Sequence, residues 1–170
     1  MSKFIGKYDT ICSIYDDFTA CNDPNMYVFQ EDYGFLRNDM TMVVSPMSTL
    51  TDGASIPSIA QFFIGSPLSG DNKFWSAQHD SGYKNTVIVI KCRSLIEKGM
   101  SPEHILKHWR NFKNEALFIH RNDLPRKWWD QNLVQAMECW DEPWLKQKIV
   151  YAGVRLGGWR HFKPNVKKEY

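Results

Sequence analysis

Two apolar segments near the start of the chain predict β-strands. Residues 26–30 (MYVFQ) and 40–44 (MTMVV) combine aromatic with β-branched side chains, and Gly, Asn and Asp lie between them. The first fifty residues are therefore expected to contain a small antiparallel sheet. Residues 45–58 are dense in Pro, Gly, Ser and Thr, which is typical of an irregular loop whose backbone groups are available for other interactions.

A helical pattern begins at about residue 72. The segment NKFWSAQHDSGYKN carries apolar residues ahead of a His-Asp pair and predicts a helix that starts near Asp71 or Asn72. Residues 86–99 leave two structures open. Their β-branched start favours a strand, whereas the later spacing of Cys92, Leu95 and Ile96 favours a helix.

Two further helices have clear start signals. Ser101 is a predicted N-cap with Pro102 at the first helical position, and another helix is expected to begin around Pro125 and to end before Pro143. The tail predicts a last amphipathic segment that is broken at the glycine pair 157–158, followed by a frayed basic end.

Length and composition predict one domain that spans residues 1–170, with a β-rich part at 1–50 and a mainly helical part at 71–160. The hydrophobic share of 43% and the charged share of 24% are close to the average for globular proteins. We therefore expect an α+β fold, in which a small N-terminal antiparallel β-sheet is followed by a helical bundle that carries the His-Asp helix.

Charge and hydropathy exclude several classes of protein. A formal net charge of +2 does not indicate nucleic-acid binding. The chain shows neither a signal-peptide pattern nor a run of eighteen apolar residues, so we expect a cytosolic product without a transmembrane segment. The cysteines show no zinc-type spacing and are expected to be free thiols: Cys12, Cys21, Cys92 and Cys139.

The candidate chemistry lies in TDGASIP (51–57) and HDSGYKN (79–85). On a helix, His79 and Tyr83 lie on one face, whereas Asp80 is turned by about 100° from His79. A carboxylate that accepted hydrogen bonds from both His79 and Tyr83 would fix the imidazole tautomer and leave the other ring nitrogen as a general base. Asp130 is the candidate, because it is an Asp inside an otherwise apolar helical stretch.

Asp80 is then expected to point toward the loop at 51–57. There Asp52 and neighbouring backbone carbonyls, such as that of Gly53, would supply the oxygen ligands that a hard cation such as calcium requires. Water deprotonated by the His would attack an ester carbonyl, and the cation would stabilise the oxyanion. The alternative is a buried His-Asp-Tyr-Asp network that is fully hydrogen-bonded, inert, and serves only to fix a pair of helices.

These motifs, together with WWDQNLVQAMECW (128–140), resemble the active-site pattern of the small bacterial and fungal secreted phospholipases of the A-two type. The resemblance implies that His79 is the base, that Tyr83 and Asp130 orient it, and that Asp80 and Asp52 are calcium ligands. It also implies a phospholipid or membrane surface as the partner.

The cysteine pair of those enzymes is missing here. Small residues stand at the corresponding positions, Ala54 in the loop and Ala77 or Ser76 before the His-Asp pair. The loss of both cysteines fits a chain that stays in a reducing compartment.

Over residues 27–160 the chain resembles the largely phage-encoded family known as domain of unknown function 1353, which also ends in a Tyr-x-x-Val-Arg-x-x-Gly pattern, here YAGVRLGG (151–158). That family implies synthesis in a host cytoplasm, with the virion as a further location, but it implies no activity. The expected function is lipid ester hydrolysis that assists passage of the host envelope. The alternative is a non-enzymatic virion or tail accessory protein, with other virion proteins as partners.

Two other features have two interpretations each. Arg155 near a helix end is expected to bind terminal carbonyls or a carboxylate, and a carboxylate partner would make it part of the scaffold. The tryptophans at 128, 129, 140, 144 and 159 either border a lipid-facing surface or pack in the core.

Overall fold

The structure is a computed structural model. It describes these residues: 2–5, 11–13, 27–52, 65, 72–84, 86–112, 117–119, 123–157 and 162. Within them, five strands form an antiparallel sheet in the order β1-β4-β5-β7-β8. The bounds of these strands are β1 Lys3–Ile5, β4 Tyr33–Leu36, β5 Thr41–Ser45, β7 Ile88–Lys91 and β8 Phe118–Ile119.

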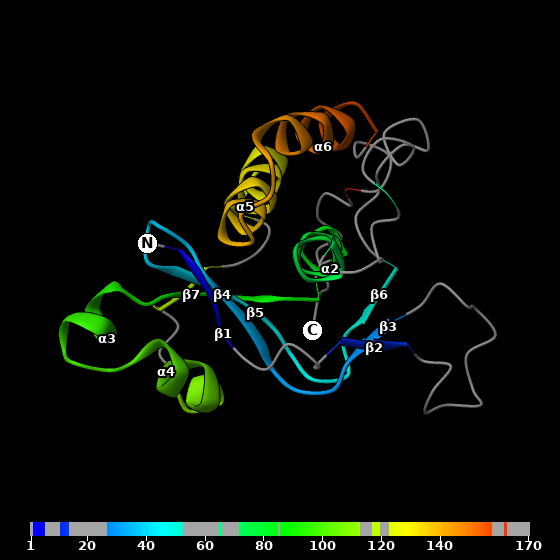
Figure 1. Ribbon diagram of the computed structural model, residues 1–170. Helices are drawn as coiled ribbons and strands as arrows, with labels where there is room; N and C mark the ends of the chain where they lie inside the picture. Colours follow the sequence, from blue (N-terminus) through cyan, green and yellow to red (C-terminus); the bar gives the residue numbers. More distant parts are fainter. Residues whose placement is uncertain are drawn as a thin grey trace.

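Helices cover both faces of this sheet (Figure 1). On one face, α2 (Asn72–Tyr83) packs against β5 and against α5 (Arg126–Cys139), and α6 (Trp144–Gly157) packs on α5. On the other face lie α3 (Arg93–Glu97) and α4 (Pro102–His108), which is followed by the 3₁₀ turn η2 (Trp109–Asn111).

The strand residues alternate between these two helical layers. Val43 of β5 joins an apolar cluster with Trp129 of α5, whereas its neighbour Met42 joins a cluster with Ile105 of α4. Every residue of β5 is buried, because a central strand with helices on both faces has no solvent side.

A second, three-stranded sheet lies beside the first. Its order is β2-β3-β6, with bounds Ile11–Ser13, Tyr27–Phe29 and Leu50–Thr51. The last strand contacts α2. The start of the Asp-Gly loop is therefore held next to the His-Asp helix.

The predicted α+β fold is confirmed, and the main helices begin where the sequence indicates. The side chain of Ser101 accepts a hydrogen bond of 3.1 Å from His104 N, as an N-cap should. Both structures considered for residues 86–99 are present, since β7 is followed directly by α3. The five-stranded sheet also includes β7 and β8, which come from well beyond residue 50.

Hydrogen bonds of polar side chains join α2 to β5 of the sheet. Gln78 is buried, and its Nε2 donates to the backbone carbonyl of Val43 at 2.8 Å, while Ser45 Oγ donates to Gln78 Oε1 at 3.4 Å. A buried amide that is hydrogen-bonded in this way fixes the rotation of the helix about its own axis. Free thiols are found at Cys92 and Cys139, whereas the prediction for Cys21 falls outside the described residues.

Candidate functional site

The site depends on a close approach of α2 and α5. Gly82 faces the indole ring of Trp129, and a Cβ atom at position 82 would overlap that ring. Only glycine permits this separation of the two helices. As a result, the side chains of His79 and Tyr83 on α2 reach α5 directly.

Asp130 receives both of these side chains. His79 Nε2 lies 3.3 Å from Asp130 Oδ1, and the Tyr83 hydroxyl donates to the same carboxylate oxygen. All three side chains are buried. The contacts expected from the sequence are therefore formed, while the catalytic roles of the three residues stay predictions.

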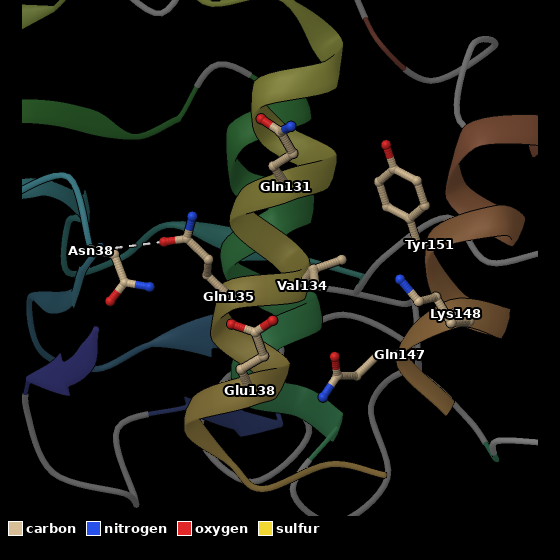
Figure 2. Close-up of a pocket in the computed structure, with 8 residues that line it drawn as sticks. All are labelled: Asn38, Gln131, Val134, Gln135, Glu138, Gln147, Lys148 and Tyr151. Atoms are coloured by element: carbon tan, nitrogen blue, oxygen red, sulfur yellow. Dashed lines mark hydrogen bonds between the residues drawn. The ribbon is translucent and has the colours of Figure 1, made fainter. Parts of the chain in front are cut away.

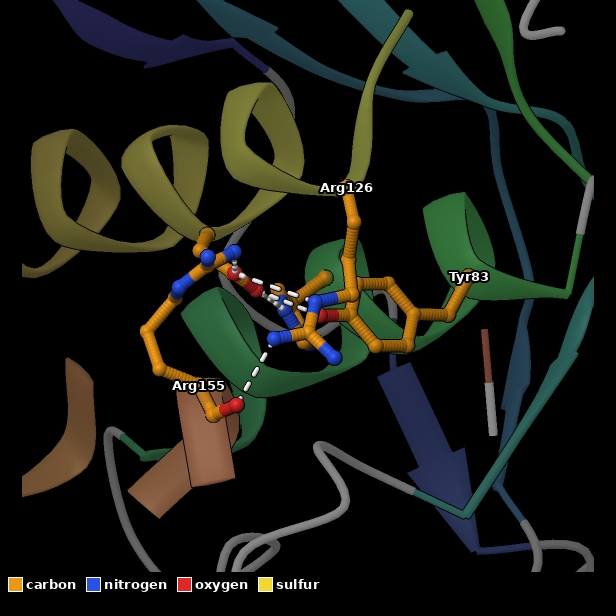
Figure 3. Close-up of polar contacts among 5 residues, drawn as sticks. Tyr83, Arg126 and Arg155 are labelled. Carbon is orange, nitrogen blue, oxygen red and sulfur yellow. Dashed lines mark hydrogen bonds and ion pairs between the residues drawn. The ribbon is translucent and has the colours of Figure 1, made fainter. Parts of the chain in front are cut away.

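Two arginines contact the other oxygen of Asp130 (Figure 3). Arg155 Nη1 of α6 lies 2.9 Å from Oδ2, and Arg126 Nε of α5 lies 3.8 Å from it. Arg126 Nη2 also donates to the backbone carbonyl of Arg155 at 2.7 Å, which joins the ends of the two helices. Arg155 thus has the carboxylate partner that makes it part of the scaffold.

Arg126 was missed by the sequence analysis. Its signal was available, because Arg126 and Asp130 are four residues apart on one helix, a spacing at which opposite charges meet. The reach of Arg155 to Asp130 had no such local signal, because it depends on the packing of α6 against α5.

These contacts set the ionisation of the network. Burial raises the pKa of Asp130, but the hydrogen bonds from His79, Tyr83 and Arg155 outweigh it, so the net pKa is lowered and the carboxylate stays ionised. Burial lowers the pKa of His79, although Asp130 opposes this. Burial and the Asp130 carboxylate raise the pKa of Tyr83, which therefore remains a donor at neutral pH.

A neutral His79 next to an ionised Asp130 fixes the tautomer. Nε2 carries the proton and donates it to Asp130, so Nδ1 keeps its lone pair. Nδ1 is buried and has no hydrogen-bond partner in the part of the chain that the structure describes. An imidazole with one nitrogen oriented by a carboxylate and the other free has the arrangement of a general base.

Asp80 points away from this network, toward the end of β6, as the helical spacing predicts. Its Oδ2 accepts hydrogen bonds from Thr51 Oγ1 at 2.8 Å and from the backbone N–H of Asp52 at 3.3 Å. The carboxylates of Asp80 and Asp52 also lie close to one another, because both contact the ammonium group of Lys84. Gly53, the third predicted metal ligand, lies outside the described residues.

A cation already lies between the two carboxylates, and it is the ammonium group of Lys84. Its Nζ is 3.0 Å from Asp80 Oδ2 and is also paired with Asp52 Oδ1. Where the structure describes the chain, no three His, Cys, Asp or Glu side chains form a group that could hold a metal. This arrangement does not fit calcium unless Lys84 moves away, so the calcium site stays a prediction.

Asp80, Asp52 and Lys84 form the second cluster of the site, and the pKa of each depends on the charges of the other two. Burial and, to a smaller degree, the charge of the neighbouring Asp52 raise the pKa of Asp80 to about 6 against the opposing effect of Lys84. Burial also raises the pKa of Asp52, but the hydrogen bond and the charge of Lys84, together with smaller hydrogen-bond effects, outweigh it, so the net pKa of Asp52 is lowered. Lys84 in turn has a raised pKa, because its two carboxylates outweigh its partial burial.

A hollow of about 540 Å³ lies between α5 and α6, apart from both clusters (Figure 2). Its lining is mostly polar and includes Gln131 and Gln135 of α5 and Tyr151 of α6. Gln135 Oε1 accepts a hydrogen bond of 3.3 Å from the backbone N–H of Asn38, so one of these amides is already engaged. Among the residues that the structure describes, none of the predicted site residues lines this hollow.

None of the helices in the described ranges has the length and apolarity needed to cross a membrane. A scan against models of known protein families found no match, and neither the curated proteins nor the solved structures gave a similar chain. The two resemblances noted in the sequence therefore stay predictions.

Proposed function

We propose that this protein is a carboxylic ester hydrolase in which His79 is the general base. The observation that carries the proposal is the state of its imidazole: Nε2 is hydrogen-bonded to Asp130, and Nδ1 is without a partner among the residues that the structure describes. The lowered pKa of His79 supports this role, because the base is then unprotonated at neutral pH.

The network around Asp130 supports the same chemistry. When Nδ1 takes a proton from water, the imidazole becomes positively charged, and the adjacent Asp130 carboxylate stabilises that charge. Tyr83 and Arg155 hold the carboxylate in place through hydrogen bonds. Arg126 also limits how far Asp130 raises the basicity of His79, since the Arg126 charge lowers the pKa of His79.

A phospholipid is the proposed substrate class, and a membrane surface the proposed partner. Besides the resemblance, one face of α6 supports this: its exposed residues are Trp144, Leu145, Lys148, Ala152 and Leu156. Trp144 is 68% exposed, Leu145 62% and Leu156 77%. An exposed apolar stripe with a basic residue and a Trp is typical of a helix that lies at a lipid interface.

The test is fatty-acid release from mixed micelles of phosphatidylglycerol and detergent. His79→Asn should abolish release, while far-ultraviolet circular dichroism shows that the fold is retained. His104→Asn is the matched control, because it makes the same substitution at an exposed histidine on α4 and should leave release unchanged. An active, folded His79→Asn protein would refute the role of His79.

A non-enzymatic virion or tail accessory protein is the second candidate. The observation that favours it is the burial of His79, whose side chain is 0% exposed. A buried, hydrogen-bonded network that only joins α2, α5 and α6 would have the same contacts. Such a protein should copurify with phage particles in a fixed ratio and release no fatty acid. Its absence from purified particles would count against this second function.

A further inference from the structure

Neither of the two resemblances noted in the sequence assigns a role to Lys84. It follows α2 directly and lies four residues after Asp80, so its side chain returns over the last turn of the helix. Its ammonium group contacts Asp80, which is 3% exposed, and Asp52, which is half-exposed at the end of β6. A single cation therefore joins the helix to the β6 end of the second sheet.

We propose that the Lys84 ammonium is the cation of this site and takes the position between Asp80 and Asp52 where a calcium ion would otherwise bind. This deepens the proposed function, because it concerns the cation of the same site. It departs in one respect from what the phospholipase resemblance implies: the protein does not bind calcium at these carboxylates.

The geometry supports this in two ways. Asp80 Oδ2, the oxygen on the side of Asp52, already accepts from Thr51, from the Asp52 backbone and from Lys84. Three donors at one oxygen leave little capacity for a further ligand. The ammonium is also attached to the same helix as Asp80, so its effective concentration at the site is far above that of calcium in solution. A calcium ion must displace it.

The charge of the site supports it as well. With Lys84 present, two carboxylates and one ammonium leave a net charge of −1. Without the ammonium the charge is −2 in a partly buried place, and that charge attracts a divalent cation through the oxygen ligands that calcium prefers. Removal of Lys84 should therefore convert the site into one that binds calcium.

The experiment is a calcium titration by calorimetry on the parent, Asp80→Asn, Lys84→Met, Lys84→Arg and Lys84→Met/Asp80→Asn. The parent and Lys84→Arg should give no binding heat. Lys84→Met should bind calcium with a dissociation constant on the order of 10⁻³ M or tighter, which is the weak end of protein calcium sites. The double variant should lose that binding, which assigns it to Asp80.

Thermal unfolding with and without calcium gives a second measurement. Only Lys84→Met should gain a calcium-dependent rise in its melting temperature, because a ligand stabilises the state that binds it. Binding by the parent that disappears in Asp80→Asn would overturn the proposal, whether or not the Lys84 variants fold. A folded Lys84→Met protein that ignores calcium would overturn it too. Neither readout depends on ester hydrolysis, so a failed lipase assay leaves this test intact.

Discussion

His79 and Asp130 lie 51 positions apart in the chain, and their side chains meet at 3.3 Å in the interior of the protein. Their contact joins α2 to α5, and Arg155 brings α6 to the same carboxylate. One buried anion therefore links the side chains of three helices. Changes at Asp130 should affect the proposed chemistry and the stability of the fold together.

Asp130→Asn should lower ester hydrolysis by about 100-fold or more, because the amide no longer fixes the tautomer of His79 or stabilises its charged form. It should also lower the free energy of unfolding by about 3 kcal/mol, since the buried His79 and Tyr83 lose an ionised acceptor and the two arginines lose their counter-charge. Urea unfolding and fatty-acid release measure the two effects.

The control for this change is Asp123→Asn, an exposed carboxylate shortly before α5. It should leave both quantities unchanged. If Asp130→Asn retained full activity, Asp130 would not orient the base.

Asp80→Asn should make the protein more stable at pH 8. The pKa of Asp80 is raised from 3.8 to about 6 in the folded protein, so the folded state holds its proton more tightly than the unfolded state. Below about pH 4, Asp80 is protonated in both the folded and the unfolded state, and the protein has the full stability that a protonated Asp80 allows. This stability is lost as the pH rises through 6. At pH 8 the loss is about 3 kcal/mol, because a tenfold change in a proton-binding constant corresponds to about 1.4 kcal/mol.

The measurement is the difference in unfolding free energy between Asp80→Asn and the parent at several pH values. This difference should be largest at pH 8 and should shrink as the pH falls through 6. His79, whose pKa is lowered, also makes stability depend on pH. Because both proteins contain it, its effect cancels in the difference. A difference that is independent of pH would show that Asp80 has an ordinary pKa.

Gly82→Ala should destabilise the protein by about 2 kcal/mol, even though alanine favours helices by about 1 kcal/mol relative to glycine. The added methyl group would overlap the fully buried ring of Trp129, which has no room to move. The double variant Gly82→Ala/Trp129→Leu tests this cause. It should be more stable than the sum of the two single changes predicts, and strict additivity would rule out the overlap.

The exposed face of α6 should bind lipid. Replacing Trp144, Leu145 and Leu156 together by Ser should weaken binding to vesicles of equal parts phosphatidylglycerol and phosphatidylcholine by at least about 10-fold, because burial of each apolar side chain is lost. Vesicle sedimentation measures this. The control is Met47→Ser, which removes another exposed apolar side chain, 56% exposed, from a different surface. Equal binding by the triple variant and the parent would exclude α6 as the lipid surface.

Local patterns were sufficient to predict one part of the site. The spacing of His79, Asp80 and Tyr83 predicts which side chains share a helix face, and the structure places Asp80 on a different side from the other two. Asp130 was found because an Asp in an apolar helical stretch needs a partner. Those inferences need only the geometry of one helix and the chemistry of a buried carboxylate.

The other contacts of the site depend on which helices and strands pack together, and no local sequence pattern predicts that packing. Arg155 reaches Asp130 only because α6 lies on α5, and the pairing of β7 with β5 joins segments separated by a whole helix. The role of Lys84 was also missed. Its spacing to Asp80 is local, but Asp52 joins the pair only through the position of β6.

The position of β7 between β5 and β8 has a consequence during synthesis. When the ribosome has made β5 and α2, one edge of β5 still lacks the strand that will cover it, because Ile88–Lys91 comes later in the chain. An apolar strand with an open edge is a template for pairing with other chains. The nascent protein should therefore be most prone to aggregation just before β7 emerges, and the helix that carries His79 gains its final surroundings only after that moment.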